Sequence, residues 1–298
     1  MGSDVAVHSP ESRATFERAA ALLGYDLLAL QADGPEEMLR ETEFSQPAIF
    51  TTNLALYRAV GREFAPVVTA GHSFAELCSL VIAKSLEFDE ALHIVSERGK
   101  AMQAAAQRAR GGMSAILGLE AARVREILRT HELAQVTLAN YNSPTQIVIS
   151  GNLDEVQAAG GAMLAGGAKR VVPLNVSGAW HSPLMEPALE RLAAAVESSH
   201  FALPEFDVIS NVDGRPYRDV QTIKTNLIRS VVDEVRWHDT AERLLSYELD
   251  LVVEFGASGV LGALMRRMSG SPPVIVVSDF AGVQKLRGAI EAAASATV

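Results

Sequence analysis

Residues 66–80 read Pro-Val-Val-Thr-Ala-Gly-His-Ser-Phe-Ala-Glu-Leu-Cys-Ser-Leu, and this stretch decides the predicted fold. Its apolar beginning at 66–70 predicts a buried strand, and 76–84 predicts a helix. The tight turn between them would present the Ser73 hydroxyl for attack, with helix N–H groups facing any oxyanion. Where the usual turn of this type ends in glycine, this chain has Ala75. The pattern alone leaves two interpretations open, a nucleophile or an ordinary strand–helix turn.

The composition is that of a compact globular protein, since 48% of the 298 residues are hydrophobic and 21% are charged. A formal net charge of −10 without a long Lys/Arg run argues against nucleic-acid binding. The sequence has no 18-residue apolar run and no signal-peptide pattern, so we expect a cytoplasmic protein without a membrane partner. Cys78 is the single cysteine, and no His/Cys/Asp cluster has ligand spacing, so we predict no disulfide and no metal site.

The order of elements predicts two parts. Around the opening stretch and again after residue 179, apolar strands alternate with helices, which indicates a parallel sheet covered on both faces. Between these parts, the order β-α-β-β-α-β predicts a ferredoxin-like unit inserted into the larger domain. We expect no element before residue 10, a helix that opens at Gln46-Pro47, and a single helix over 182–199. The inserted unit is expected to have strands at 113–119, 135–141, 146–150 and 169–176, and helices at 121–131 and 153–164.

Three further residues are candidates for the site. His181 follows the last strand of the small unit and precedes a helix, which places it at the predicted domain junction. It could be the base that a serine nucleophile needs, or a satisfied histidine at a helix cap. His72 adjoins Ser73 but points elsewhere on a tight turn, so it is a poor base for its neighbour. Arg98 is either a solvated arginine or a clamp for a substrate carboxylate.

Gly71-His-Ser-Phe-Ala-Glu76 resembles the Gly-His-Ser-Leu-Gly-Glu of malonyl-CoA:acyl carrier protein transacylases and of polyketide synthase acyltransferase domains. The resemblance covers nearly the whole chain and implies an α/β-hydrolase-like core with a parallel sheet, at 1–110 and 179–298. It implies a ferredoxin-like insert at 111–178. The further matching segments are Gln46-Pro-Ala-Ile49, Glu97-Arg-Gly-Lys-Ala-Met102, Asn140-Tyr-Asn-Ser-Pro144, Val176-Ser-Gly-Ala-Trp-His-Ser-Pro-Leu-Met185, Ser210-Asn-Val-Asp-Gly214 and Val253-Glu-Phe-Gly-Ala-Ser-Gly-Val-Leu261.

The resemblance also assigns roles to residues. Ser73 would carry the acyl group as an ester, and His181 would be its base, oriented by a backbone carbonyl for which we select Ser230. Arg98 would pair with the free carboxylate of malonyl, and the Phe74 N–H would donate to the oxyanion. Four more residues would bind substrate: His72, Met102, Asn142 and Trp180. Trp180 stands where malonyl-selective relatives often have Phe.

Two departures from the family pattern bear on activity. The family normally begins with a strand and Gly-Gln-Gly-Ser-Gln, whose glutamine N–H is the second oxyanion donor. Here Met1-Gly-Ser-Asp4 aligns just after that segment, and loss of one donor costs about 10²–10³-fold in rate. The expectation is therefore either a start further upstream, or an absent segment with an activity that is reduced or rebuilt from other residues. Ala75 in place of glycine is the milder departure.

The function implied by the resemblance is malonyl transfer from coenzyme A to the phosphopantetheine thiol of an acyl carrier protein, for fatty-acid or polyketide synthesis. The expected partners are malonyl-CoA, as a thioester substrate with no further cofactor, and the carrier protein; a monomer is expected. One alternative is an editing hydrolase for carrier proteins, although Arg98 gives no advantage with an uncharged acyl chain. The second alternative is a docking protein with weak catalysis. It is suggested by the lack of a Gly-Gln-Gly-Ser-Gln segment in this sequence.

Overall fold

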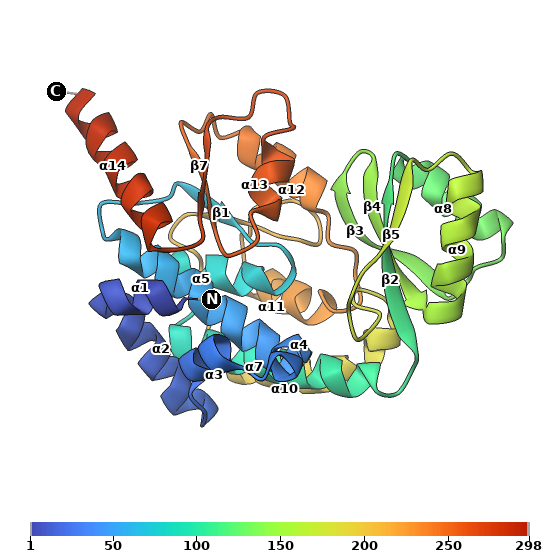
Figure 1. Cartoon of the computed structure of the whole chain (residues 1–298), viewed down its shortest axis with the longest axis horizontal. Coiled ribbons are helices and arrows are strands. Elements are labelled where there is room, and N and C mark those ends of the chain that lie inside the picture. Colours follow the sequence, from blue (N-terminus) through green and yellow to red (C-terminus); the bar gives the residue numbers. More distant parts are fainter. Residues whose placement is uncertain (1, 297–298) are drawn as a thin grey trace.

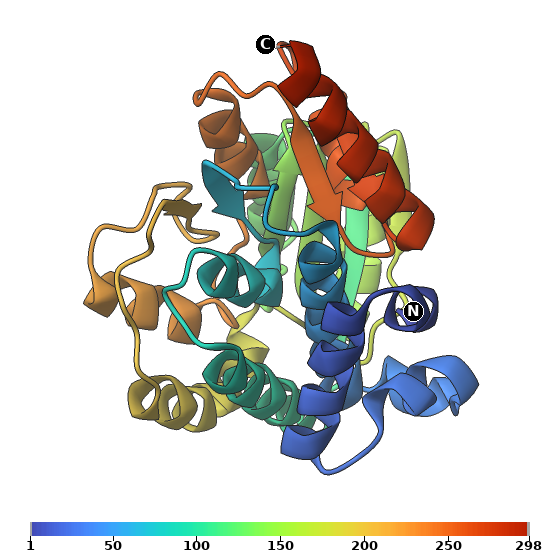
Figure 2. The ribbon, with the colours of Figure 1, turned by 90° about the vertical axis from the view of Figure 1, so that its left-hand side faces the viewer.

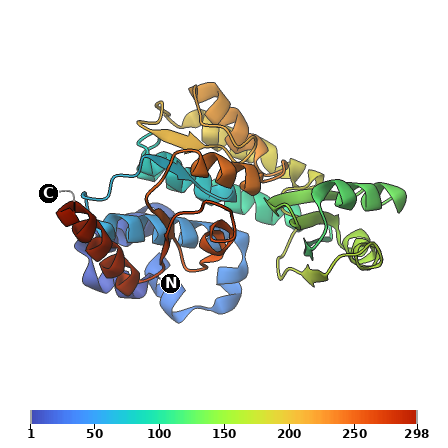
Figure 3. The same ribbon diagram turned by 90° about the horizontal axis from the view of Figure 1, so that it is seen from above.

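The computed structural model describes residues 2–296 and has two visibly different parts (Figure 1). A larger, helix-rich part holds both termini, and a four-stranded sheet with two helices projects from one end of it (Figure 3). The first 110 residues form α1 (Ser3–His8), α2 (Pro10–Leu23), α3 (Leu27–Asp33), α4 (Glu36–Arg40), α5 (Thr42–Val60), β1 (Val68–Ala70), the 3-10 turn η1 (Ser73–Ala75), α6 (Glu76–Ile82) and α7 (Phe88–Ala106).

Two expectations for this region were wrong. Residues 3–8 form α1, whose Val5 and Ala6 are buried. Packing against α2 and α5 stabilises this helix, although it is too short to be stable alone. Helix α5 begins at Thr42 and contains Pro47 in its interior instead of opening there. The helix is buried over most of its surface between α2 and α7, so tertiary packing outweighs the break that proline favours.

The projecting part is an antiparallel sheet with the strand order β3-β4-β2-β5. Its helices pack on one face around a core of their own that includes Ile116, Ile147 and Met163. The opposite face carries Met113, Ala139 and Val148, which pack against Trp180. Strands and helices occur close to the predicted positions: β2 (Gly111–Leu117), α8 (Ala121–Thr130), β3 (Val136–Ser143), β4 (Gln146–Asn152), α9 (Leu153–Ala165) and β5 (Arg170–Pro173).

The chain enters and leaves this antiparallel unit at the same place. Gly111, the first residue of β2, lies so close to Ala179 that a Cβ atom at position 111 would be 2.7 Å from the Ala179 backbone nitrogen. A second link to the larger part runs along β3, where the Tyr141 N–H donates to the Val235 carbonyl and the Val235 N–H to the Ala139 carbonyl, both at 2.8 Å. The unit is therefore fixed to the larger part at two sides.

The rest of the chain completes the larger part. Strand pairing there is parallel, as predicted, but it forms two separate pairs, β1 with β6 and β7 with β8. Within residues 2–296, no strand hydrogen bonds to both pairs. The elements are η2 (Pro183–Ala188), α10 (Leu189–Ser198), β6 (Asp207–Ile209), α11 (Val220–Arg229), α12 (Trp237–Leu245), β7 (Val252–Phe255), α13 (Val260–Met265), β8 (Val274–Val277) and α14 (Phe280–Ala296).

The predicted single helix over 182–199 is divided into η2 and α10, because Pro187 lies inside the first segment and cannot donate a helical hydrogen bond. Helices α5 and α7 supply the centre of the main core, with Phe50, Leu54 and Leu92 fully buried. Helix α14 lies across β8 and α5 (Figure 2). Among the helices of residues 2–296, none has the length and apolar character required to cross a membrane.

Candidate active site

Ser73 stands on a sharply bent turn between β1 and α6. Its φ angle is +56°, in the left-handed region that non-glycine residues rarely occupy. The turn is tight because Gly71 lies against the start of the helix, where a Cβ atom would be 2.1 Å from the Ala75 carbonyl. Ala75 itself has ordinary right-handed helical angles, φ −65° and ψ −10°. Alanine therefore fits this position without backbone strain, and the departure from glycine has no conformational cost.

Replacing Gly71 by alanine should lower the free energy of unfolding by about 1–3 kcal/mol or more, since the new methyl group overlaps backbone atoms that cannot move away. Urea unfolding followed by circular dichroism would measure the change. The matched control is Ala75→Gly, for which we expect a loss of at most about 1 kcal/mol from added chain flexibility. Equal stability of Gly71→Ala and the native chain would contradict the packing described for this turn.

His181 lies directly against the serine. Its Nε2 atom is 2.9 Å from Ser73 Oγ, and its Nδ1 atom is 2.7 Å from the Ser230 carbonyl and 3.2 Å from that of Asp233. Since carbonyls only accept, Nδ1 carries the proton and the Nε2 lone pair faces the hydroxyl. Burial lowers the pKa of His181 to about 3, assisted by the charge of Arg98. The neutral imidazole can thus take a proton from Ser73.

Arg98 is buried in the middle of α7, with 2% of its surface exposed. Its Nη2 donates to Ser73 Oγ at 3.1 Å and its Nη1 to Gln46 Oε1 at 2.8 Å. Nε has no partner, and Arg98 forms no ion pair with any residue of the described chain. Burial lowers its pKa to about 10, so the guanidinium remains charged at neutral pH. A buried cation that forms no salt bridge with the described residues, within hydrogen-bond distance of the serine hydroxyl, is suited to receive a carboxylate.

The other predicted residues lie around these three. His72 Nε2 is 3.2 Å from Asn142 Oδ1 at the end of β3, so this hydrogen bond joins the turn to the antiparallel unit. The ring of Phe74 lies 5.9 Å from the Arg98 guanidinium carbon. Met102 is buried one helical turn beyond Arg98, and its sulfur accepts from Gln46 Nε2 at 3.4 Å.

Trp180 is the predicted residue that the described contacts do not bring to Ser73. Its side chain packs between the main core and the face of the antiparallel sheet that is opposite the two helices. Gly178 makes room for it, since a Cβ at that position would be 2.6 Å from the indole ring. Trp180 therefore lies at the junction of the two parts, and it directly precedes His181 in the sequence.

Several residues of the site could not be selected from the sequence. Gln46 is part of a matching segment, but its contact with Arg98 joins two different helices, α5 and α7, and depends on how they pack. The Asp233 carbonyl is a backbone group, so the type of residue at this position does not predict its contact with His181. Asn211 and Glu76 also belonged to matching segments, and only the fold shows that the Asn211 side chain bonds both backbone groups of Ser73.

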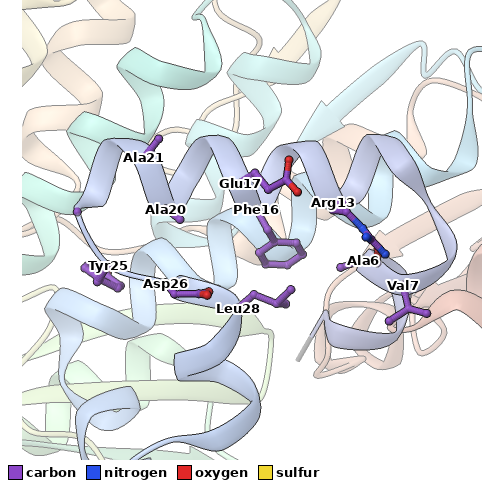
Figure 4. A pocket seen from close by; sticks show the side chains of 11 residues that line it. Ala6, Val7, Arg13, Phe16, Glu17, Ala20, Ala21, Tyr25, Asp26 and Leu28 are labelled. Atoms are coloured by element: carbon purple, nitrogen blue, oxygen red, sulfur yellow. The ribbon is translucent and has the colours of Figure 1, made fainter.

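A hollow of about 700 Å³ lies elsewhere, among α1, α2 and the start of α3 (Figure 4). It is lined by apolar side chains such as Phe16 and Leu28, with Arg13 and Glu17 at its edge, and includes none of the residues around Ser73. For metals, residues 2–296 contain no group of three or more His, Cys, Asp or Glu side chains that could hold an ion.

A strained serine, a neutral histidine on its hydroxyl and a buried arginine beside both form the kind of site that acyl-transfer enzymes with a serine nucleophile use. Residues 1–279 match the acyl transferase domain family, and the chain belongs to it. It is 38% identical to a malonyl CoA-acyl carrier protein transacylase of Salmonella typhimurium, over 90% of this chain and 88% of the relative.

Solved structures agree with this assignment. A type II PKS acyl-carrier protein in complex with its malonyl-transacylase matches with a TM-score of 0.91 and 36% identity, covering 97% of this chain and 94% of that one. The malonyl CoA-acyl carrier protein transacylase of Coxiella burnetii matches with a TM-score of 0.92 and 34% identity, covering 97% and 92%. A polyketide biosynthesis malonyl CoA-acyl carrier protein transacylase of Bacillus velezensis is 36% identical over 85% of this chain and 87% of its own.

Proposed function

We propose that this protein transfers a malonyl group from coenzyme A to the phosphopantetheine thiol of an acyl carrier protein, for fatty-acid or polyketide synthesis. The observation that carries the proposal is Arg98, a buried guanidinium that forms no salt bridge with the described residues and lies 3.1 Å from Ser73 Oγ. A neutral acyl chain would leave this charge unpaired, whereas the free carboxylate of malonyl pairs with it. The names of the relatives and of the matching complex support the same substrate and carrier.

The reaction has two half-reactions. Ser73 Oγ attacks the thioester carbonyl while its proton passes to His181 Nε2, and the Phe74 N–H stabilises the oxyanion. The carbon–sulfur bond then breaks, and coenzyme A leaves as a thiol with the proton from His181. Next, the carrier thiol gives its proton to His181 and attacks the Ser73 ester. That ester bond breaks, Ser73 regains the proton, and the malonyl thioester of the carrier is released.

The remaining assignments extend this proposal. His72, Met102, Asn142 and Trp180 would bind or shape the substrate around the Arg98–Ser73 pair, and the Ser230 carbonyl would orient His181. We also propose an α/β-hydrolase-like core at 1–110 and 179–298 with a ferredoxin-like insert at 111–178. The strand order β3-β4-β2-β5, with two helices on one face, supports that insert. The protein would act as a monomer, with the coenzyme A thioester as substrate and no other cofactor.

The test follows radiolabel from malonyl-CoA. We expect label on the protein, and transfer to added carrier protein at a rate well above release to water. Faster release to water than to the carrier would favour the editing hydrolase. Label from acetyl-CoA or longer acyl thioesters without label from malonyl-CoA would contradict the malonyl assignment. Carrier binding without any label would identify a docking protein instead.

A further inference from the structure

Asn211, which follows β6, is bonded to the backbone of the serine itself. Its Oδ1 accepts the Ser73 N–H at 3.1 Å, and its Nδ2 donates to the Ser73 carbonyl at 3.1 Å. The side chain is 1% exposed, so water does not compete for these bonds. A single amide therefore satisfies both backbone groups of the residue whose φ angle is +56°.

Behind Asn211 lies a buried carboxyl group that the proposed reaction does not use. Glu76, at the start of α6, has no exposed surface. Its Oε2 accepts from Asn211 Nδ2 at 2.6 Å, and its Oε1 accepts from the hydroxyl of Tyr217, which is also buried. Within residues 2–296, Glu76 forms no ion pair. Burying an acid costs free energy unless hydrogen bonds satisfy its oxygens, and here Asn211 and Tyr217 supply those bonds.

The carboxyl group determines which way the Asn211 amide points. If the amide were turned over, its NH₂ group would face the Ser73 N–H, and its oxygen would face both the Ser73 carbonyl and Glu76 Oε2. Those pairings are donor against donor and acceptor against acceptor. A carboxylate offers acceptors only, so it holds Nδ2 toward itself and leaves Oδ1 for the Ser73 N–H.

We propose that Asn211 and Glu76 are positioning residues for Ser73: the Glu76 carboxyl orients the Asn211 amide, and the amide holds the serine backbone in the left-handed conformation that presents Oγ to His181. Neither side chain touches the reacting atoms. The role in malonyl transfer rests on the proposed function, whereas the effect on Ser73 itself does not.

The charges around Glu76 set the pH range for a test. The pKa of Glu76 is raised to about 7, mainly by burial and to a smaller degree by the charge of Asp213, against the opposing hydrogen bonds from Tyr217 and Asn211. Arg98 on α7 is the cation that interacts with it. His181, whose pKa is about 3, stays neutral from pH 5.5 to 8. Wild type and variants share this base, so the ratio of their rates in this range reports on the carboxyl group.

Asn211→Asp replaces only the amide NH₂ group by an oxygen, so it tests whether that donor positions Ser73. The new carboxylate would have only oxygens to face Glu76 and the Ser73 carbonyl, which are acceptors too. At pH 8 both of these hydrogen bonds are therefore lost. Reaction with a fluorophosphonate, in which Ser73 Oγ displaces fluoride and its proton passes to His181, should slow by roughly 10- to 100-fold. Near pH 5.5, the two acids share a proton that restores a donor. The rate relative to wild type should then recover roughly fivefold or more.

Asn152→Asp is the matched control, because the Asn152 Oδ1 also accepts two backbone N–H groups, while its NH₂ group has no described hydrogen bond to an acid within residues 2–296. It should label at the wild-type rate. A ratio of Asn211→Asp to wild type that does not change with pH would overturn the proposal.

If Asn211→Asp does not fold, Glu76→Gln and Glu76→Ala decide the question. Glutamine keeps an oxygen for Asn211 Nδ2 and alanine keeps none, so alanine should react about tenfold more slowly than glutamine. Equal rates for the two would contradict the proposal. Since the probe carries no malonyl group, a protein that reacts with fluorophosphonate and not with malonyl-CoA would refute only the proposed function.

Discussion

Replacing Ser73 by alanine should remove the covalent malonyl label and lower malonylation of the carrier protein by on the order of 10⁶-fold. The oxygen that would carry the ester is then absent, and His181 Nε2, 2.9 Å away in the native site, has no hydroxyl proton to take. Intact-protein mass spectrometry after mixing with malonyl-CoA measures the label, and a coupled assay measures free coenzyme A.

Ser79→Ala is the matched control for this variant. Ser79 lies on α6, the helix that follows Ser73, and is buried, but it has no described contact with His181 or Arg98. Label and turnover should stay close to the native values. Persistence of a malonyl adduct on Ser73→Ala would show that another residue is the nucleophile.

Arg98→Ala should reduce acylation by malonyl-CoA by about 10²–10³-fold, because the substrate carboxylate would then be buried without a partner. Acetyl-CoA, which has no carboxylate, should react with the variant no more slowly than with the native protein. Arg98→Lys keeps the charge but loses the two-pronged geometry, and we expect an intermediate rate. The measurement is the single-turnover rate of acyl-enzyme formation with each thioester.

The comparison of the two substrates also tests a competing role. Arg98 Nη2 donates to Ser73 Oγ, so the arginine could act on the serine and not on the acyl group. In that case malonyl and acetyl rates would fall together in Arg98→Ala. A loss confined to malonyl assigns Arg98 to the carboxylate.

Local signals predicted those elements whose ends are marked by particular residues. Pro10 begins α2 and the helix ends before Gly24, and the apolar run at Val274–Val277 is β8 without change. Pro47 was a misleading signal, because burial of α5 outweighs the helix break that proline favours. The division of 182–199 depends on Pro187 alone, which the prediction of one helix did not take into account. Helix α1 is stabilised by contacts with α2 and α5 that no short sequence pattern reveals.

The site was predictable where a residue type and its motif together imply a task. Ser73, His181 and Arg98 come from three segments. The structure places both His181 and Arg98 within hydrogen-bond distance of the Ser73 hydroxyl. The residues that hold them were not predictable. The Asp233 carbonyl is a backbone atom that any residue could supply, and the contact between Asn211 and Ser73 depends on the parallel pairing of β1 with β6.

The close approach of Gly111 to Ala179 has a consequence for how the chain reaches its folded state. Ser73 and His181 are 108 residues apart in sequence, and closing a flexible loop of that length costs conformational entropy. The antiparallel unit has its own core, and its two ends meet at Gly111 and Ala179. Once this unit is folded, only the segments from Ser73 to Gly111 and from Ala179 to His181 remain to be closed. The residues between Gly111 and Ala179 then add little to the entropy cost of assembling the site.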